Sequence, residues 1–171
     1  PMDVCVDAGV QVGQGGGTPT GGIYSGPGVT DNGNGTDYDF DPAAAGAGVH
    51  TLTYTYTDAN GCTSSASDEV EVFALPEVTL STIEFLCQES GVQTNLNGGT
   101  PTGGIYAGTG VTDNGDGTTF TFDPNISGLG DIQISYTYTD INGCTDTALD
   151  TIQVVSCEQT IEDPCACLDN A

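Results

Sequence analysis

The chain has 171 residues, of which 24 are Asp or Glu, one is His and none is Lys or Arg, so its formal charge at pH 7 is −24. Nucleic acids and anionic membrane surfaces are bound through cationic side chains, which excludes both as partners. P-loop nucleotide binding and Schiff-base catalysis need a lysine and are excluded as well. The classes that remain are a carboxylate-only enzyme, a cation binder, and a structural or adhesive protein.

The chain contains an internal repeat. Residues 16–36 and 98–118 are identical at 18 of 21 positions, at an offset of 82 residues. The same offset aligns Cys5 with Cys87 and Cys62 with Cys144. We therefore expect two copies of one module. The predicted boundaries are module 1 at residues 1–75, module 2 at 76–156, and a Cys-rich linker or the start of a further module at 157–171.

Strands are predicted wherever apolar and polar residues alternate. In chain order, the strands of module 1 and their aligned segments in module 2 are 38–40 with 120–122, 49–57 with 132–138, and 70–72 with 152–154. Turns rich in Asp, Asn and Gly separate them, at 31–35 and 59–61 and again at 113–117 and 141–143. No helical period is found, and no apolar run is long enough to insert directly into a membrane. The predicted fold class is all-β, with two tandem immunoglobulin-like antiparallel β-sandwich modules.

Seven cysteines indicate an oxidising, extracellular location. A module of about 80 residues has a modest core, so we expect one disulfide to join the early and late segments of each copy. The predicted bridges are Cys5–Cys62 and Cys87–Cys144, with Cys157–Cys165 closing a short linker loop. Cys167 is then either the early cysteine of a further module or a partner in an intermolecular disulfide.

The strings GGTPTGGIY, GVTDNG, FDP and TYTYTD-x-NGC, each present twice, resemble the tandem Ig-like or PKD-like repeats of large Bacteroidota adhesins. These adhesins belong to the surface and secreted proteins exported by a type IX pathway, including gliding and attachment filaments. The resemblance covers nearly all of residues 1–156 and implies β-sandwich modules that build extracellular stalks or fibres. It implies no enzymatic activity.

Two kinds of site are candidates. Oxygen ligands clustered on turns suit calcium, although the spacing is not that of an EF-hand and plain hairpin turns are the simpler interpretation. The candidate ligands are Asp31, Asn32, Asn34, Asp113, Asn114 and Asp116. Thr147 and Thr151 follow aspartates in a pattern that resembles the short O-glycosylation motif of this bacterial group. His50 aligns with apolar Ile132, and the acidic residues lie mostly on turns and strand exteriors, so we expect neither acid–base catalysis nor glycoside hydrolysis.

The sequence therefore predicts a non-enzymatic extracellular segment that builds a stiff stalk, fibre or filament on a cell surface. Its expected partners are copies of itself or further modules of the same chain, and no cofactor is required. The alternative is a calcium-dependent adhesin module that binds glycans or cell surfaces through its turns.

Overall fold

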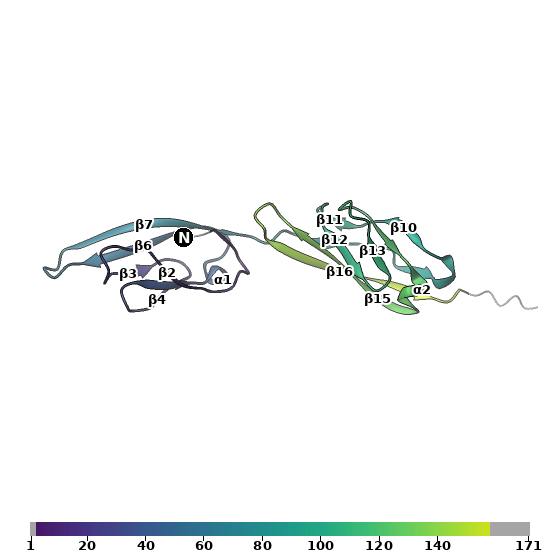
Figure 1. Ribbon diagram of the computed structural model, residues 1–171, viewed down its shortest axis with the longest axis horizontal. Coiled ribbons are helices and arrows are strands. Elements are labelled where there is room, and N and C mark those ends of the chain that lie inside the picture. The colour runs from purple at the N-terminus through teal and green to yellow at the C-terminus, as the bar shows by residue number, and fades with distance from the viewer. Residues whose placement is uncertain (1–2, 158–171) are drawn as a thin grey trace, which may run out of the picture. The chain divides into compact units, whose positions relative to one another are not determined.

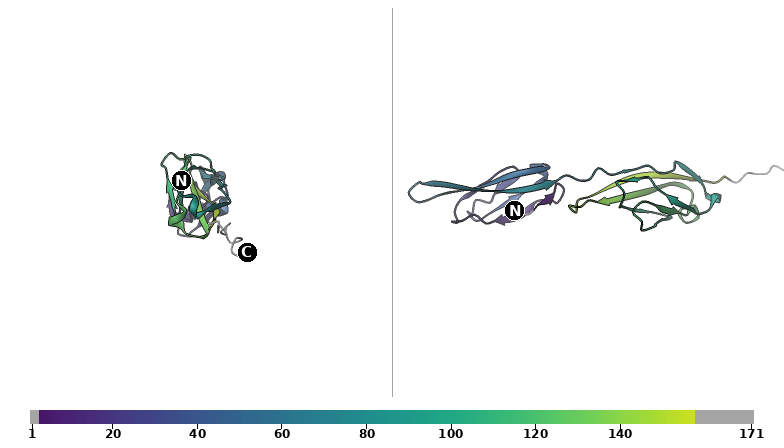
Figure 2. Two further views of the ribbon diagram at one scale, coloured as in Figure 1. Left: turned by 90° about the vertical axis from the view of Figure 1, so that its right-hand side faces the viewer. Right: turned by 90° about the horizontal axis from the view of Figure 1, so that it is seen from above.

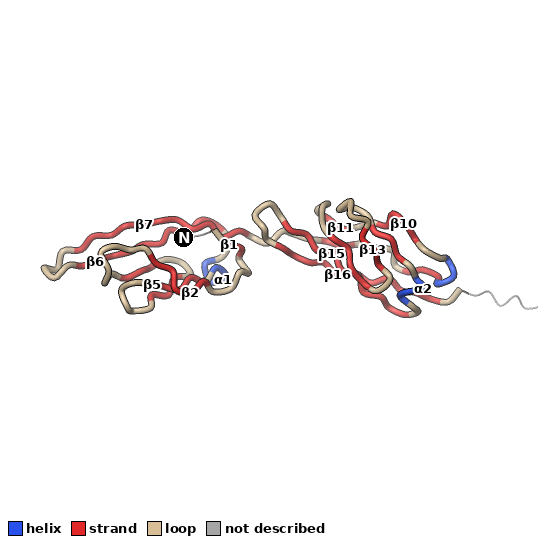
Figure 3. Tube along the Cα trace, viewed as in Figure 1, coloured by secondary structure: helices blue, strands red, loops and turns tan. Residues whose placement is uncertain are grey.

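The computed structural model describes residues 3–157 and consists almost entirely of β-strands (Figure 1 and Figure 3). The chain divides into two compact units. Unit 1 contains Pro1–Pro76 together with Thr139–Asp146, and unit 2 contains Glu77–Tyr138 and the residues from Thr147 onward. The all-β fold class is thus confirmed. Within the described residues, no helix has the length and apolar character that a membrane span requires.

Module 1 contains two sheets that enclose one core. The first sheet has the order β1, β7, β6, β3, which are Val4–Cys5, Thr63–Phe73, Gly48–Thr57 and Ile23–Ser25. The second has the order β2, β5, β4, which are Gln11–Gly15, Asp37–Phe40 and Val29–Asp31. A single helical turn, α1 (Pro42–Ala45), begins after Asp41, whose side chain accepts hydrogen bonds from two backbone amides of that turn. The β6–β7 hairpin is a long ribbon that extends beyond the second sheet (Figure 1 and Figure 2).

Module 2 repeats this arrangement and adds a sheet of two short strands. Its first sheet has the order β12, β15, β16, β9, which are Ile105–Gly108, Gly130–Thr139, Thr145–Val155 and Phe85–Cys87. Its second has the order β10, β14, β13, which are Gln93–Leu96, Phe120–Phe122 and Val111–Asp113. The additional strand, β8 (Thr79–Leu80), pairs antiparallel with β11 (Gly99–Thr100). Two short helical turns complete the module, η1 (Gln88–Ser90) and α2 (Pro124–Ser127).

The alternating residues of the predicted strands supply both cores. The core of module 1 consists of Tyr24, Tyr38, Phe40, Leu52, Tyr54, Val70 and Val72. The core of module 2 consists of the residues that align with them, namely Tyr106, Phe120, Phe122, Ile134, Tyr136, Ile152 and Val154. In each core, the tyrosine of the short strand β3 or β12 contacts two further aromatic rings with centroids 4.5–4.6 Å apart.

The glycine-rich motif, the longest identical string in the repeat, covers a buried tyrosine in each module. A Cβ placed on Gly99 would lie 2.6 Å from ring carbons of Tyr136, and one on Gly17 equally close to the ring of Tyr54. No side chain larger than hydrogen fits at this approach. The Tyr136 hydroxyl accepts a hydrogen bond from the Gly104 amide (2.8 Å) and donates one to the Pro101 carbonyl (2.5 Å). The motif is therefore explained by packing.

Replacing Tyr136 with Phe is expected to lower the free energy of unfolding by about 1–3 kcal/mol. The substitution leaves the buried Gly104 amide without its acceptor, while the ring packing is retained. Urea denaturation followed by circular dichroism measures this loss. The matched variant is Tyr138→Phe, whose hydroxyl takes no part in holding the glycine motif. If both variants lose the same stability, the hydroxyl contacts with Gly104 and Pro101 have no special role.

The disulfide prediction was wrong. The structure joins Cys5 to Cys144, within unit 1, and Cys87 to Cys157, within unit 2. Among the described residues, Cys62 is free and exposed. The predicted Cys157–Cys165 bridge is therefore wrong as well, and Cys165 and Cys167 lie outside the described residues.

The parallel pairing of the first strand explains why the predicted bridges cannot form. β1 runs parallel to β7, so that Cys5 lies beside Phe73 at the end of β7, whereas Cys62 immediately precedes its start. Eleven residues of extended strand separate these positions by about 35 Å. A disulfide needs its Cα atoms within roughly 7 Å. The same argument applies to Cys87, which lies beside Val155 at the end of β16.

Candidate functional site

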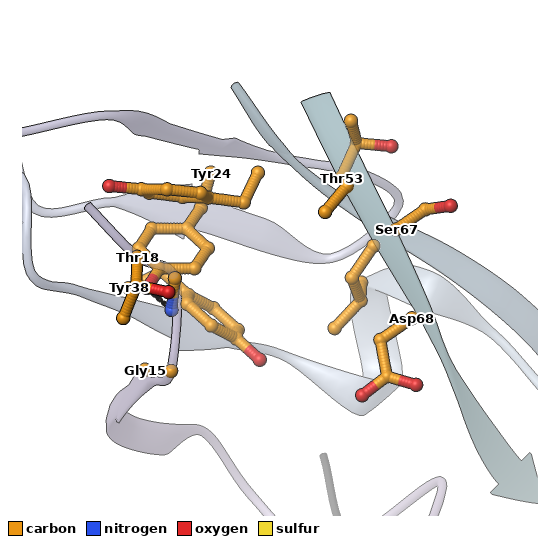
Figure 4. Close-up of a pocket in the computed structure, with 12 residues that line it drawn as sticks. Gly15, Thr18, Tyr24, Tyr38, Thr53, Ser67 and Asp68 are labelled. Carbon is orange, nitrogen blue, oxygen red and sulfur yellow. Dashed lines mark hydrogen bonds between the residues drawn. The ribbon is translucent and has the colours of Figure 1, made fainter. Parts of the chain in front are cut away.

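A pocket of about 270 Å³ opens into the core of module 1. It lies between the glycine segment that follows β2 and the middle of β7. Figure 4 shows Tyr24 and Tyr38 on one side of it and Ser67 and Asp68 on the other. The residues that line it are Gly15, Gly16, Gly17, Thr18, Tyr24, Tyr38, Leu52, Thr53, Tyr54, Ala66, Ser67 and Asp68. All of them belong to unit 1.

The opening is local. Tyr24, Leu52 and Tyr54 are 7–8% exposed, whereas the aligned Tyr106, Ile134 and Tyr136 are 0–2% exposed. Val70 and Val72 are 1–2% exposed and their counterparts 0–1%, whereas Phe40, which does not line the pocket, is 4% exposed and its counterpart Phe122 is 0% exposed. The largest differences between the two cores lie at Tyr24, Leu52 and Tyr54, which line the pocket.

In module 2, a strand of the same chain occupies the corresponding place. β8 pairs with β11 in the register Gly99–Leu80 and Thr100–Thr79. The Ser81 amide then donates to the Gly98 carbonyl (3.2 Å). Three apolar side chains of this segment pack against the core, those of Val78, Leu80 and Ile83.

The segment is fixed at its far end by Asp150. The carboxylate of Asp150 accepts hydrogen bonds from the Thr82 amide (2.5 Å) and the Thr82 hydroxyl (2.8 Å). The counterparts of Gly98, Gly99, Thr100 and Asp150 are Gly16, Gly17, Thr18 and Asp68, all of which line the pocket of module 1. In module 2, β8 thus covers the place that corresponds to the pocket of module 1.

The attachment of this strand in module 2 is expected to weaken in acid. The Thr82 amide holds the pKa of Asp150 below its usual value. A carboxyl whose pKa is lower in the folded state stabilises the fold above its unfolded pKa of about 3.9, and this stabilisation is lost as the pH falls below that value. Wild-type protein and Asp150→Asn should therefore differ in thermal midpoint at pH 7 and converge below about pH 4.

Glu69→Gln is the control for this prediction, because it removes one negative charge from a strand without touching Thr82. Glu69→Gln keeps the contact between Thr82 and Asp150, so the difference in thermal midpoint between this variant and wild type should not report on that contact at any pH. A wild-type to Asp150→Asn difference that stays constant from pH 7 to pH 2.5 would contradict the assigned role of the carboxylate.

The pocket is apolar with hydrogen-bonding edges and carries negative charge. Burial raises the pKa of Tyr38, and the nearby Tyr24 and Asp68 add to this rise. The pocket-lining residues include no histidine, cysteine or cation. Three hydroxyl side chains, those of Thr18, Thr53 and Ser67, line it together with the carboxylate of Asp68.

The candidate calcium ligands belong to hairpin turns. Asp31 accepts hydrogen bonds from the amides of Tyr24 (2.7 Å) and Gly33 (2.8 Å), and Asp113 accepts those of Tyr106 and Gly115 in the same way. The Asn34 and Asp116 side chains accept from amides two and three residues further on. Asn32 and Asn114 each donate to the side chain five residues on, and Asn114 also accepts from the Thr121 hydroxyl.

These oxygens thus stabilise the turns. Over residues 3–157, no group of three His, Cys, Asp or Glu side chains is arranged to hold a metal ion. Calcium binding through the mixed Asp and Asn sets stays a prediction.

The remaining predicted sites lie on β-strands. Thr147 and Thr151 are both exposed on β16, so that their hydroxyls lie outside the core, and the Thr147 hydroxyl is hydrogen-bonded to that of Thr137 (2.9 Å). Their glycosylation stays a prediction. His50 is half-buried on β6, where its Nε2 lies 2.7 Å from the Gly46 carbonyl.

Comparison with known proteins gives a structural likeness at low sequence identity. No family model matches the chain, and no curated protein matches it. Among solved structures, the insect immune protein hemolin, described as having a domain arrangement with implications for homophilic adhesion, is similar over 91% of this chain, with 14% identity and a TM-score of 0.37. The chain spans 44% of the hemolin chain.

Proposed function

We propose that this chain is a non-enzymatic segment of a repetitive extracellular protein, and that its modules serve as structural and adhesive units of a stalk, fibre or filament on a cell surface. The observation that carries the proposal is the disulfide between Cys5 and Cys144, which ties the first copy of the repeat covalently to the hairpin of the second. Such a bond removes chain entropy from the unfolded state and so stabilises unit 1 against unfolding.

The charge of the chain supports the same proposal. With 24 acidic residues and no Lys or Arg, the surface repels itself at low ionic strength and is relieved by screening in a saline medium. The absence of Lys and Arg also leaves trypsin-like proteases no cleavage site. Both properties suit a long-lived extracellular assembly.

Electron microscopy of the producing cells tests this function. Antibodies raised against the chain are expected to label surface filaments or stalks at a regular axial spacing, in the presence and in the absence of a calcium chelator. Label confined to the cytoplasm or to isolated particles would overturn the proposal. Attachment to glycan-coated surfaces that is abolished by the chelator, without any labelled filament, would instead favour the calcium-dependent adhesin.

A further inference from the structure

We propose that Cys62 is one half of a disulfide between modules, and that its partner is the early cysteine, the counterpart of Cys5, on a neighbouring copy of the repeat. This inference deepens the proposed function, on which it rests, by naming the covalent joint between modules. The neighbouring module belongs either to the same polypeptide or to a second molecule, and the chemistry of the joint is the same in both cases.

The partner can be specified because the aligned cysteine of module 2 has one. Cys144 aligns with Cys62, and it is bonded to Cys5, the early cysteine of the other copy. The hairpin segment that carries it, Thr139–Asp146, is part of unit 1. Cys144 is 1% exposed there, whereas Cys62 is exposed and free. One hairpin cysteine thus shows the bond that we assign to the other.

The turns that carry the two hairpin cysteines have the same hydrogen bonds. In module 1, the Asp58 amide donates to the Cys62 carbonyl (2.9 Å) and the Gly61 amide donates to the Asp58 carbonyl (3.0 Å). In module 2, the matching bonds of the Asp140 turn are 2.9 and 3.1 Å long. The backbone therefore holds Cys62 in the conformation in which Cys144 is bonded.

The residue two places after the last strand of a module decides which partner the early cysteine takes. In module 2 this residue is Cys157, which is bonded to Cys87 within unit 2. In module 1 it is Leu75, and Cys5 is bonded to the hairpin of the other copy. We therefore expect the partner of Cys62 to lie in a module that, like module 1, has no cysteine at this position.

The bond forms by thiol–disulfide exchange with a disulfide oxidant in the surrounding medium. The Cys62 thiolate attacks one sulfur of the oxidant and releases a thiol, which leaves Cys62 in a mixed disulfide. The thiolate of the early cysteine then attacks the Cys62 sulfur and releases the second thiol. The two cysteines have lost two electrons and two protons, which the oxidant has gained. Because Cys62 is exposed, the oxidant can reach it for the first step.

Non-reducing peptide mapping of the protein isolated from the producing cells tests the joint. We expect the Cys62 peptide to be linked to a peptide with an early cysteine, and Cys62 to react with a maleimide only after reduction. Denaturing gels with and without reductant identify the source of the partner. A size that reduction leaves unchanged places both modules on one polypeptide, whereas a ladder that collapses to single chains places them on separate molecules.

A chain extended by one repeat period adds a matched control. Residues 1–82, with Cys62→Ser, are placed before Pro1 of the full chain, at the spacing found between the two copies. We expect the added early cysteine to be bonded to Cys62 of the full chain, whose maleimide labelling is then lost. With Leu75→Cys in the added copy, that early cysteine should be bonded within its own copy, and labelling of Cys62 should return. Circular dichroism confirms that both chains are folded.

Three results would overturn the inference. These are a free Cys62 in the native protein, a bond from Cys62 to a cysteine other than an early one, and an extended chain in which Cys62 stays reactive. A Cys62 that stays bonded despite Leu75→Cys would overturn the role of that position. Filaments labelled by the antibody together with a free Cys62 would remove this joint and leave the proposed function standing. The Cys62 bond without labelled filaments would do the reverse.

Discussion

Replacing Cys144 with serine is expected to lower the free energy of unfolding of unit 1 by about 5 kcal/mol. The Cys5–Cys144 bridge closes a loop over a sequence separation of 139 residues, and a loop of that length removes about this much chain entropy from the unfolded state. Cys144 is 1% exposed and Cys5 is half-buried. Urea denaturation followed by circular dichroism measures the loss.

Cys62→Ser is the matched control. Cys62 occupies the same position of the hairpin in module 1, and the two cysteines have the same contact with the turn. The Cys62 amide donates a hydrogen bond to Asp58 (2.8 Å), as the Cys144 amide does to Asp140 (2.9 Å). Because Cys62 is free and exposed, its replacement should change stability by less than about 0.5 kcal/mol. Equal losses in the two variants would contradict the assigned bridge.

Peptide mapping under non-reducing conditions tests the same pairing directly. The chain has no Lys or Arg, so a protease that cleaves beside acidic residues is needed in place of trypsin. We expect one linked pair that contains Cys5 with Cys144 and one that contains Cys87 with Cys157. A Cys5–Cys62 pair would require about 35 Å of movement along β7 and would disprove the strand register described above.

The sequence predicts the strands well because their signal is local. Alternating apolar residues identify the cores, and the Asp, Asn and Gly turns lie between strands where they were expected. The pairing of the cysteines depends on information that is not local. It requires the knowledge that β1 runs parallel to β7, which places the early and late cysteines at opposite ends of a strand.

One clue to the pairing is nevertheless present in the repeat. Cys157 aligns with Leu75, so module 2 has a cysteine two residues beyond its last strand where module 1 has none. Cys87 can thus be bridged within its own module, whereas Cys5 needs a partner from elsewhere. The positions that match between the two copies do not reveal this bridge, because Cys157 has no cysteine counterpart in the first copy.

The pocket was missed for a related reason. Nothing in the glycine segment or in β7 of module 1 indicates on its own that a space is left beside the core. The apolar residues Val78 and Leu80 were predicted to lie in module 2, but no strand was predicted for them. Only the structure shows that they cover a core that is open in the other copy.

Because the core of module 1 is open at the pocket and the core of module 2 is closed, cavity-creating substitutions are expected to cost different amounts of stability in the two modules. Ile134→Ala is expected to destabilise its unit by about 4 kcal/mol, because Ile134 is fully buried beneath a closed core and its removal leaves an empty space. Leu52, its counterpart, lines the existing pocket and is 7% exposed. Leu52→Ala enlarges a space that is already open to solvent. Its loss in the free energy of unfolding should therefore be smaller than that of Ile134→Ala by about 1 kcal/mol.

Urea denaturation of the two variants, with amide exchange to assign each transition to its unit, measures this difference. A Leu52→Ala cost equal to that of Ile134→Ala would mean that the pocket of module 1 is closed in solution.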